Sequence, residues 1–157
     1  MGFAFFFFVS WLAAAVFAVM HKTLTFVENT FVFLLIMIIS VNGSWILFEE
    51  MKWLQVSQQP IDYTSFLIHR SISIPLLVVI AINLLRRTKS LWTSLLIVFV
   101  SVTLLVAFGM MGRFFHITKI VHWNAIFDAL YFVMLHLIAY YAFKFFHRIH
   151  QSEAKVE

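Results

Sequence analysis

The sequence predicts an all-α fold: a polytopic integral membrane protein built as a bundle of five transmembrane helices. Three observations support this fold class. Hydrophobic residues make up 63% of the chain and charged residues only 11%. Apolar segments recur at the length of about 20 residues that crosses roughly 30 Å of hydrocarbon. The segments between them are short and contain neither repeats nor low-complexity linkers, so residues 1–157 are expected to form a single transmembrane helical domain.

The composition excludes several classes of protein. A soluble domain of 157 residues has too little interior to bury this much apolar surface. The chain has no cysteine, which excludes disulfides, thiolate zinc sites and cysteine-ligated iron–sulfur clusters. The net charge of +4 is modest, and the basic residues lie beside apolar segments. This distribution is typical of membrane topology rather than of nucleic-acid binding, so we expect no nucleic-acid partner.

The five spans follow from the order of the apolar segments. The first segment has no Lys or Arg ahead of its apolar run, which favours a retained helix over a cleaved signal peptide; cleavage would leave four spans. The third segment is preceded by Pro60, which suits the first turn of a helix, so this helix is expected to begin near Pro60. The expected spans are Phe3–Met20, Thr30–Phe48, Phe66–Leu85, Leu91–Gly112 and Asn124–Phe146.

The placement of Lys and Arg predicts the orientation. Seven of the eleven basic residues fall on one side of the five-span arrangement and four on the other. The richer side is expected to be cytoplasmic, which places the N-terminus outside and the C-terminus inside a cell membrane. The seven are Lys22, Arg86, Arg87, Lys89, Lys144, Arg148 and Lys155.

The third span carries a charge inside its apolar run. Arg70 lies about four residues, or roughly 6 Å, below the outer edge of that run. Asp128 lies at the same depth in the fifth span, which runs in the same direction. Because each charge is costly in lipid alone, the sequence predicts an intramembrane ion pair between Arg70 and Asp128.

The same span contains Pro75, which predicts a helix kink. A proline frees a backbone carbonyl about one turn earlier, and the hydroxyl of Ser71 or Ser73 is expected to satisfy it. An ordinary proline kink is the favoured interpretation. The alternative is a functional hinge, or a cavity beside the kink.

Several polar residues are expected to converge on the outer face. The segment RFFHITKIVHWN places a polar residue at every third position, which predicts a short helix lying in the membrane interface. The alternative is a site for an anionic headgroup or ligand, with the cations as its floor. The residues of this expected polar cluster are His69, Glu49, Glu50, Arg113, His116 and His122.

A second candidate position lies near the membrane midplane. His136 and Tyr140 are four residues apart and therefore share a face of the fifth helix. A histidine at this depth faces the bundle interior and is a candidate for function. The alternative is a neutral imidazole bonded to Asn42, Ser101 or Thr103 of a neighbouring helix.

The motifs argue against catalysis. The chain contains no GxSxG, no phosphate-binding glycine loop and no HExxH, so we expect neither an enzyme nor a bound cofactor. The histidines have no metal-ligand spacing, and no metal site is expected. Haem binding is disfavoured because His136 lies about 18 Å into its span and His69 only about 4 Å.

These observations favour a small accessory or interaction subunit, or a membrane sensor. The expected partners are the lipid bilayer and either another membrane protein or a second copy of the chain. The alternative function is a small transporter or an ion or proton pathway that uses His136, Arg70 and Asp128. Haem or metal binding is the third.

Overall fold

The computed structural model describes residues 1–121 and 124–153. In this part of the chain, five helices are long and apolar enough to cross a membrane, which confirms the predicted all-α, five-span fold class. The third span begins at Pro60, as expected, and Pro60 occupies the first turn of its helix. The five spans are Gly2–Val19, Phe26–Glu50, Pro60–Arg87, Leu91–Phe114 and Ala125–Ile149.

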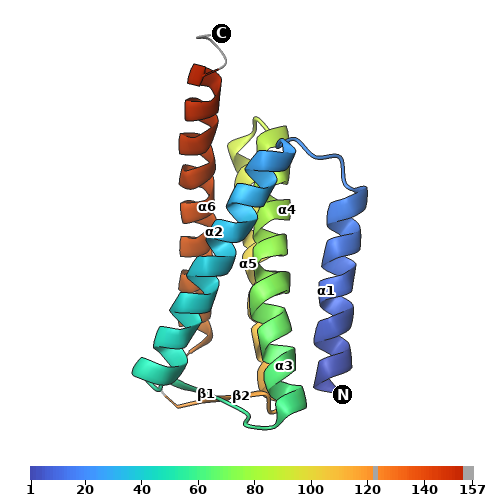
Figure 1. Cartoon of the computed structure of the whole chain (residues 1–157), viewed down its shortest axis with the longest axis vertical. Helices are drawn as coiled ribbons and strands as arrows, with labels where there is room; N and C mark the ends of the chain where they lie inside the picture. Colours follow the sequence, from blue (N-terminus) through green and yellow to red (C-terminus); the bar gives the residue numbers. More distant parts are fainter. Residues whose placement is uncertain (122–123, 154–157) are drawn as a thin grey trace.

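The second span ends in a π-helical turn, the third is interrupted by one, and two short strands lie between spans (Figure 1). The elements in order are α1 Gly2–Val19, α2 Phe26–Trp45, the π-turn η1 Ile46–Glu50, β1 Leu54–Val56, α3 Pro60–Ile68, the π-turn η2 His69–Ser73, α4 Ile74–Arg87, α5 Leu91–Phe114, β2 Thr118–Ile120 and α6 Ala125–Glu153.

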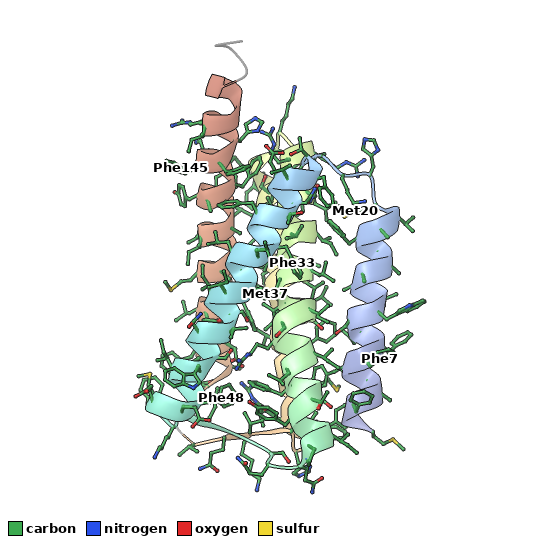
Figure 2. All side chains as sticks on the ribbon, viewed as in Figure 1. Phe7, Met20, Phe33, Met37, Phe48 and Phe145 are labelled. Carbon is green, nitrogen blue, oxygen red and sulfur yellow. The ribbon has the colours of Figure 1, made fainter. Side chains whose placement is uncertain are left out.

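Helix α4 is the central helix of the bundle. It packs against α2, α5 and α6, and its residues Val78, Val79 and Ile82 are almost fully buried. Leu105 of α5 and Leu135 of α6 complete this core from the facing helices. The other spans keep most of their side chains on the surface, where Figure 2 shows them radiating outward from the helices. This outward apolar surface suits contact with lipid.

The strands β1 and β2 form an antiparallel ribbon across one end of the bundle, hereafter the ribbon end (Figure 1). Leu54 pairs with Ile120, Gln55 with Lys119 and Val56 with Thr118. The N-terminus lies at the ribbon end, and α6 ends at the opposite end.

The ribbon overturns the expected interfacial helix in RFFHITKIVHWN. Helix α5 ends at Phe114, and His116 then takes a positive φ of 57°, which redirects the chain. Thr118 and Ile120 are β-branched and therefore fit a strand better than a helix. The three-residue spacing of polar groups reflects this turn and strand rather than a helical stripe, and His122 lies outside the described residues.

The end opposite the ribbon is fixed by buried amides. Asn83 on α4 donates to the Asn29 side chain at 2.7 Å, and its carbonyl oxygen accepts from the backbone N–H groups of Thr23 and Leu24 at 3.0 and 3.2 Å. Asn29 in turn donates to the Leu24 carbonyl at 3.0 Å. These bonds satisfy the backbone of the α1–α2 connection, which has no regular structure of its own.

The same end carries a polar contact between the second and fifth spans. Thr25 and Glu28 form a capping box at the start of α2, with Thr25 N–H donating to Glu28 at 2.8 Å. The second oxygen of Glu28 accepts from His147 of α6, at 2.5 Å. One buried carboxylate therefore caps α2 and links it to α6.

Pro75 lies just after the π-turn η2. In that turn the Ile74 N–H donates to the His69 carbonyl, five residues back. In this register the next donor would be the N–H of Pro75 and its acceptor the carbonyl of Arg70. Proline has no N–H, so this carbonyl has no partner within the helix. The hydroxyl of Ser40 on α2 donates to that carbonyl at 3.2 Å. The predicted partners Ser71 and Ser73 were wrong in this role: Ser40 reaches the freed carbonyl from a neighbouring helix.

Candidate functional site

A polar cavity of about 90 Å³ lies at the ribbon end, between α2, η1, η2, α5 and α6. Phe48, labelled in Figure 2, and Leu54 of β1 are among its apolar wall residues. A cavity of this size holds a few water-sized groups, since about 10–15 Å³ suffices for one. Its polar lining residues are Ser44, His69, Arg70, Arg113, Thr118, Asp128 and Tyr131.

One wall of the cavity is an ion pair between α5 and α6. Arg113 donates from Nη2 to Asp128 Oδ2, and the two side chains are only 18% and 14% exposed. Asp128 lies in the first turn of α6 and Arg113 in the last turn of α5. Each charge therefore also complements the dipole of its own helix end.

This pairing corrects the predicted Arg70–Asp128 ion pair. Both residues line the cavity, but Asp128 pairs with Arg113, and no ion pair among the described residues includes Arg70. The sequence prediction of Arg70 as the partner of Asp128 rested only on the equal depth of the two residues in their spans. The antiparallel connection from α5 to α6 brings Arg113 against Asp128 more directly.

Arg70 instead contacts an aromatic ring. Its guanidinium carbon lies 5.1 Å from the centroid of the Phe66 ring, a cation–π distance. Its Nε atom is buried and has no hydrogen-bond partner. Arg70 therefore lines the cavity and has a buried donor that no protein group satisfies.

His69 forms the second unsatisfied group. His69 is buried, with 9% of its surface exposed. The centroid of its ring lies 4.8 Å from that of the Phe6 ring of α1 and 6.2 Å from that of the Phe108 ring of α5. Its Nδ1 atom has no hydrogen-bond partner. The imidazole is therefore held by aromatic packing, and its Nδ1 atom has no protein partner.

The third unsatisfied atom is the hydroxyl of Tyr131 on α6. The hydroxyls of Ser40 and Ser44 lie nearby, but each donates its hydrogen to a backbone carbonyl. Ser40 donates to the carbonyl of Arg70, and Ser44 donates to the carbonyl of Ser40. Tyr131 lies close to Gly43 of α2, where a methyl group would make a tight contact of 3.1 Å with the Tyr131 oxygen. The absence of a side chain at Gly43 lets Tyr131 lie against α2.

The ribbon borders both this cavity and a larger pocket of about 410 Å³ on the surface. Leu54 and Thr118 line the cavity, whereas Gln55, Val56 and Lys119 line the surface pocket. The two short strands therefore contribute residues to both.

Only part of the expected outer cluster comes together. His69 and Arg113 line the cavity, and His116 lines the surface pocket. Glu49 and Glu50 lie on the exposed turn η1 and line neither. Among residues 1–121 and 124–153, no group of three His, Asp or Glu side chains is placed to hold a metal ion.

His136 lies away from the cavity and is fully bonded. Its Nδ1 atom is 2.7 Å from the Phe132 carbonyl, to which it donates, and its Nε2 atom accepts from the Ser101 hydroxyl at 2.9 Å. Ser101 is one of the three partners expected from the sequence. Tyr140 is 41% exposed and stacks edge-on against Tyr141, so it does not join His136.

Sequence reasoning missed Tyr131 and the pairing role of Arg113. Tyr131 lies three residues after Asp128 and thus on the same helix face, which is the signal that could have identified it. Gly43 carried a signal as well, since small residues mark close helix packing. What it packs against depends on the fold.

No family model, curated protein or solved structure matches the chain. The fold and site define the class: an all-α protein with five membrane-spanning helices and a polar cavity at one end. The chemistry of that cavity therefore has to support any function proposed for it.

Proposed function

We propose that this protein is a small, non-catalytic membrane sensor that binds a small polar solute in the ribbon-end cavity. The observation that carries the proposal is the set of buried polar atoms without a protein partner: His69 Nδ1, Arg70 Nε and the Tyr131 hydroxyl. All three residues line the same cavity.

The energetics favour binding over a purely structural role. A buried polar atom without a partner costs about 1–3 kcal/mol, and such atoms are rare in folded proteins. Three of them around one cavity would be a considerable cost to stability. A bound polar solute removes that cost by supplying the missing hydrogen bonds.

The cavity also has a route by which binding can affect the rest of the bundle. His69 and Arg70 belong to η2, which continues directly into the central helix α4. Because α4 packs against α2, α5 and α6, a shift of η2 is transmitted to the core. This connection supports a sensor rather than a passive binding site.

The alternative of a pathway across the membrane has less support. His136 uses both ring nitrogens in hydrogen bonds, and it does not line the cavity. Beyond the cavity the core is packed with almost fully buried Val78, Ile82 and Leu135. These features favour a solute that enters and leaves at the same end.

An accessory role remains compatible with a second feature. A mostly apolar groove of about 440 Å³ lies between α1, α2 and α4, lined by Phe17, Phe26, Phe33 and Leu76 among others. Such a groove suits a helix of another membrane protein, to which a sensor would pass its signal. We propose this as the second candidate function.

The charge distribution supports a cell-membrane orientation with the ribbon end outside. Arg86 and Arg87 in the last turn of α4, together with Lys89 in the connection after it, lie at the opposite end of the bundle (Figure 1). Basic connections are retained on the cytoplasmic side. The sensor would then sample solutes outside the cell.

The test is thermal unfolding of the purified protein in lipid nanodiscs with a panel of small anions, neutral polar solutes and apolar controls. A ligand at 100 times its Kd stabilises a protein by about 2.7 kcal/mol, which is readily measured. We expect at least one polar solute to raise the unfolding temperature of the wild type and to have no such effect on Arg70→Met.

Arg86→Met is the matched control, because Arg86 lies 5.1 Å from the Phe143 ring, the same contact that Arg70 makes with Phe66. This variant should retain the full response. A panel without any stabilising polar solute, or an equal response in Arg70→Met, would overturn the proposal.

A further inference from the structure

We infer that the ligand of the ribbon-end cavity is a small soluble anion that binds to Arg70. The inference rests on the proposed function and names the chemical class of the solute. It follows from the charges that line the cavity, from the hydrogen-bonding capacity of its unsatisfied atoms, and from its size.

The charges of the lining do not balance without an anion. The cavity is lined by two guanidinium groups, those of Arg70 and Arg113, and by one carboxylate, that of Asp128. Arg113 and Asp128 neutralise each other as an ion pair. Arg70 has no carboxylate partner in the described residues, and an uncompensated charge within a membrane bundle is unfavourable. A monovalent anion compensates it.

The unsatisfied atoms require an acceptor. Arg70 Nε can only donate a hydrogen bond, because a guanidinium has no acceptor. The Tyr131 hydroxyl and His69 Nδ1 can donate as well. A ligand that accepts from all three is therefore an anion or another acceptor-rich group, whereas a metal cation would face the guanidinium charge at close range.

The size and lining of the cavity favour a small soluble anion over a larger anion or a lipid headgroup. At about 90 Å³ the cavity suits a halide, nitrate, formate or bicarbonate better than a large organic anion. A lipid headgroup would offer similar phosphate chemistry, but it remains attached to its acyl chains. Leu54 and Thr118 of the ribbon also line the cavity, so part of its wall is polypeptide of the ribbon rather than a surface that faces lipid. These features favour a soluble anion over a headgroup.

The experiment is a titration of the protein in nanodiscs with sodium chloride, nitrate, formate and bicarbonate. Sodium gluconate keeps the ionic strength constant, and unfolding temperature and ³⁵Cl NMR line width are recorded. We expect at least one small anion to stabilise the protein and to displace chloride in the NMR measurement. Arg70→Met should lower the affinity about tenfold to a hundredfold, as expected for the loss of a charged hydrogen bond. Arg86→Met should leave it unchanged.

A second variant keeps the test decisive if Arg70→Met does not fold. Asp128→Asn removes the carboxylate that competes for Arg113, so it should raise the anion affinity severalfold even if it lowers basal stability. Unchanged or weaker anion binding in folded Asp128→Asn would contradict the inference.

The remaining outcomes separate the two proposals. If only a neutral polar solute stabilises the protein, and Arg70→Met loses this effect, the inference of an anionic ligand would be overturned. The proposal of a sensor for a polar solute would still stand. No response to any solute would overturn both. Stabilisation that requires phosphatidylglycerol and is absent in phosphatidylcholine discs with added anion would overturn the soluble source in favour of a lipid headgroup.

Discussion

Two arginines at the ribbon end have different surroundings, although both line one cavity. Arg113 pairs with Asp128, and the dipoles of α5 and α6 favour both charges. Arg70 lies over the Phe66 ring and keeps its Nε atom without a partner. The first arginine thus joins α5 to α6, and the second is the residue that we propose binds a ligand.

The first prediction at this scale concerns the ion pair. Asp128→Asn should destabilise the protein by about 3 kcal/mol, because it leaves Arg113 mostly buried without a counter-charge. The charge swap Arg113→Asp with Asp128→Arg should restore only part of this, since each charge then opposes its helix dipole by about 0.3–1 kcal/mol. Equilibrium unfolding in mixed micelles measures both. Full recovery in the swapped variant would show that the helix ends contribute nothing.

The second prediction concerns His136. Ser101→Ala removes the hydroxyl that donates to Nε2, so it should cost about 0.6 kcal/mol, the typical value for a polar contact between membrane helices. The anion response of this variant should match that of the wild type, because His136 lies outside the cavity. A lost response in a folded Ser101→Ala protein would reassign His136 to the binding site.

At the scale of elements, the π-turn η2 sets where His69 and Arg70 point. A π-turn accommodates one extra residue in a helical turn, and one residue of an α-helix corresponds to about 100° of rotation. The position of Pro75 and the Ser40 hydrogen bond suit the π register. The cavity therefore depends on an irregularity in the third span.

The third prediction tests this dependence. Pro75→Ala supplies the missing N–H, so the third span can continue as an α-helix and α3 should rotate relative to α4. Because the chain has no cysteine, Ser65→Cys provides a unique reporter at a fully buried position. We expect a water-soluble maleimide to label this cysteine in the Pro75→Ala background and to spare it in the parent.

Thr64→Cys is the matched control for that measurement, since Thr64 is exposed in the parent structure. The Pro75→Ala protein should also lose its anion response while keeping most of its stability. Protection of the cysteine introduced by Ser65→Cys in both backgrounds would show that Pro75 does not determine the register.

The ribbon shows which elements sequence patterns can identify. The five spans were predictable because the bilayer requires long apolar helices whatever they pack against. The pairing of Gln55 with Lys119 joins two distant loops, and no local pattern encodes such a partner. The helical interpretation of that loop failed because its polar spacing fitted both a helix and a turn followed by a strand.

The same distinction applies to the site. Arg70, His69, Arg113 and Asp128 were identifiable as unusual polar residues at one end of the bundle. Their pairing was not, since depth along a span leaves the rotation of each helix undetermined. Residue types and depths are therefore readable from the sequence, whereas contacts depend on how the helices face one another.

At the scale of the whole molecule, the two ends of the bundle differ. The ribbon end has a cavity with unsatisfied donors. At the opposite end, Asn29, Asn83, Glu28 and His147 bond to one another or to the backbone. The end opposite the ribbon holds the helices together, and the ribbon end is where we propose that a solute binds.

The fourth prediction concerns how these ends lie across the membrane. Gln58→Cys, in the ribbon-end loop, should react with an impermeant maleimide on intact cells. Ser90→Cys, in the connection after α4, should react only after permeabilisation, because the basic residues beside it favour the cytoplasm. The reverse labelling pattern would invert the orientation and place the cavity on the cytoplasmic side.

The charged residues of the cavity come from three successive spans: Arg70 from the third, Arg113 from the fourth and Asp128 from the fifth. During synthesis these spans leave the ribosome in that order. Arg113 therefore reaches the membrane before Asp128 is available, and an arginine at this position is costly without its counter-charge. The ion pair between Arg113 and Asp128 thus forms only once the fifth span has been made, so we expect the ribbon end to be completed last.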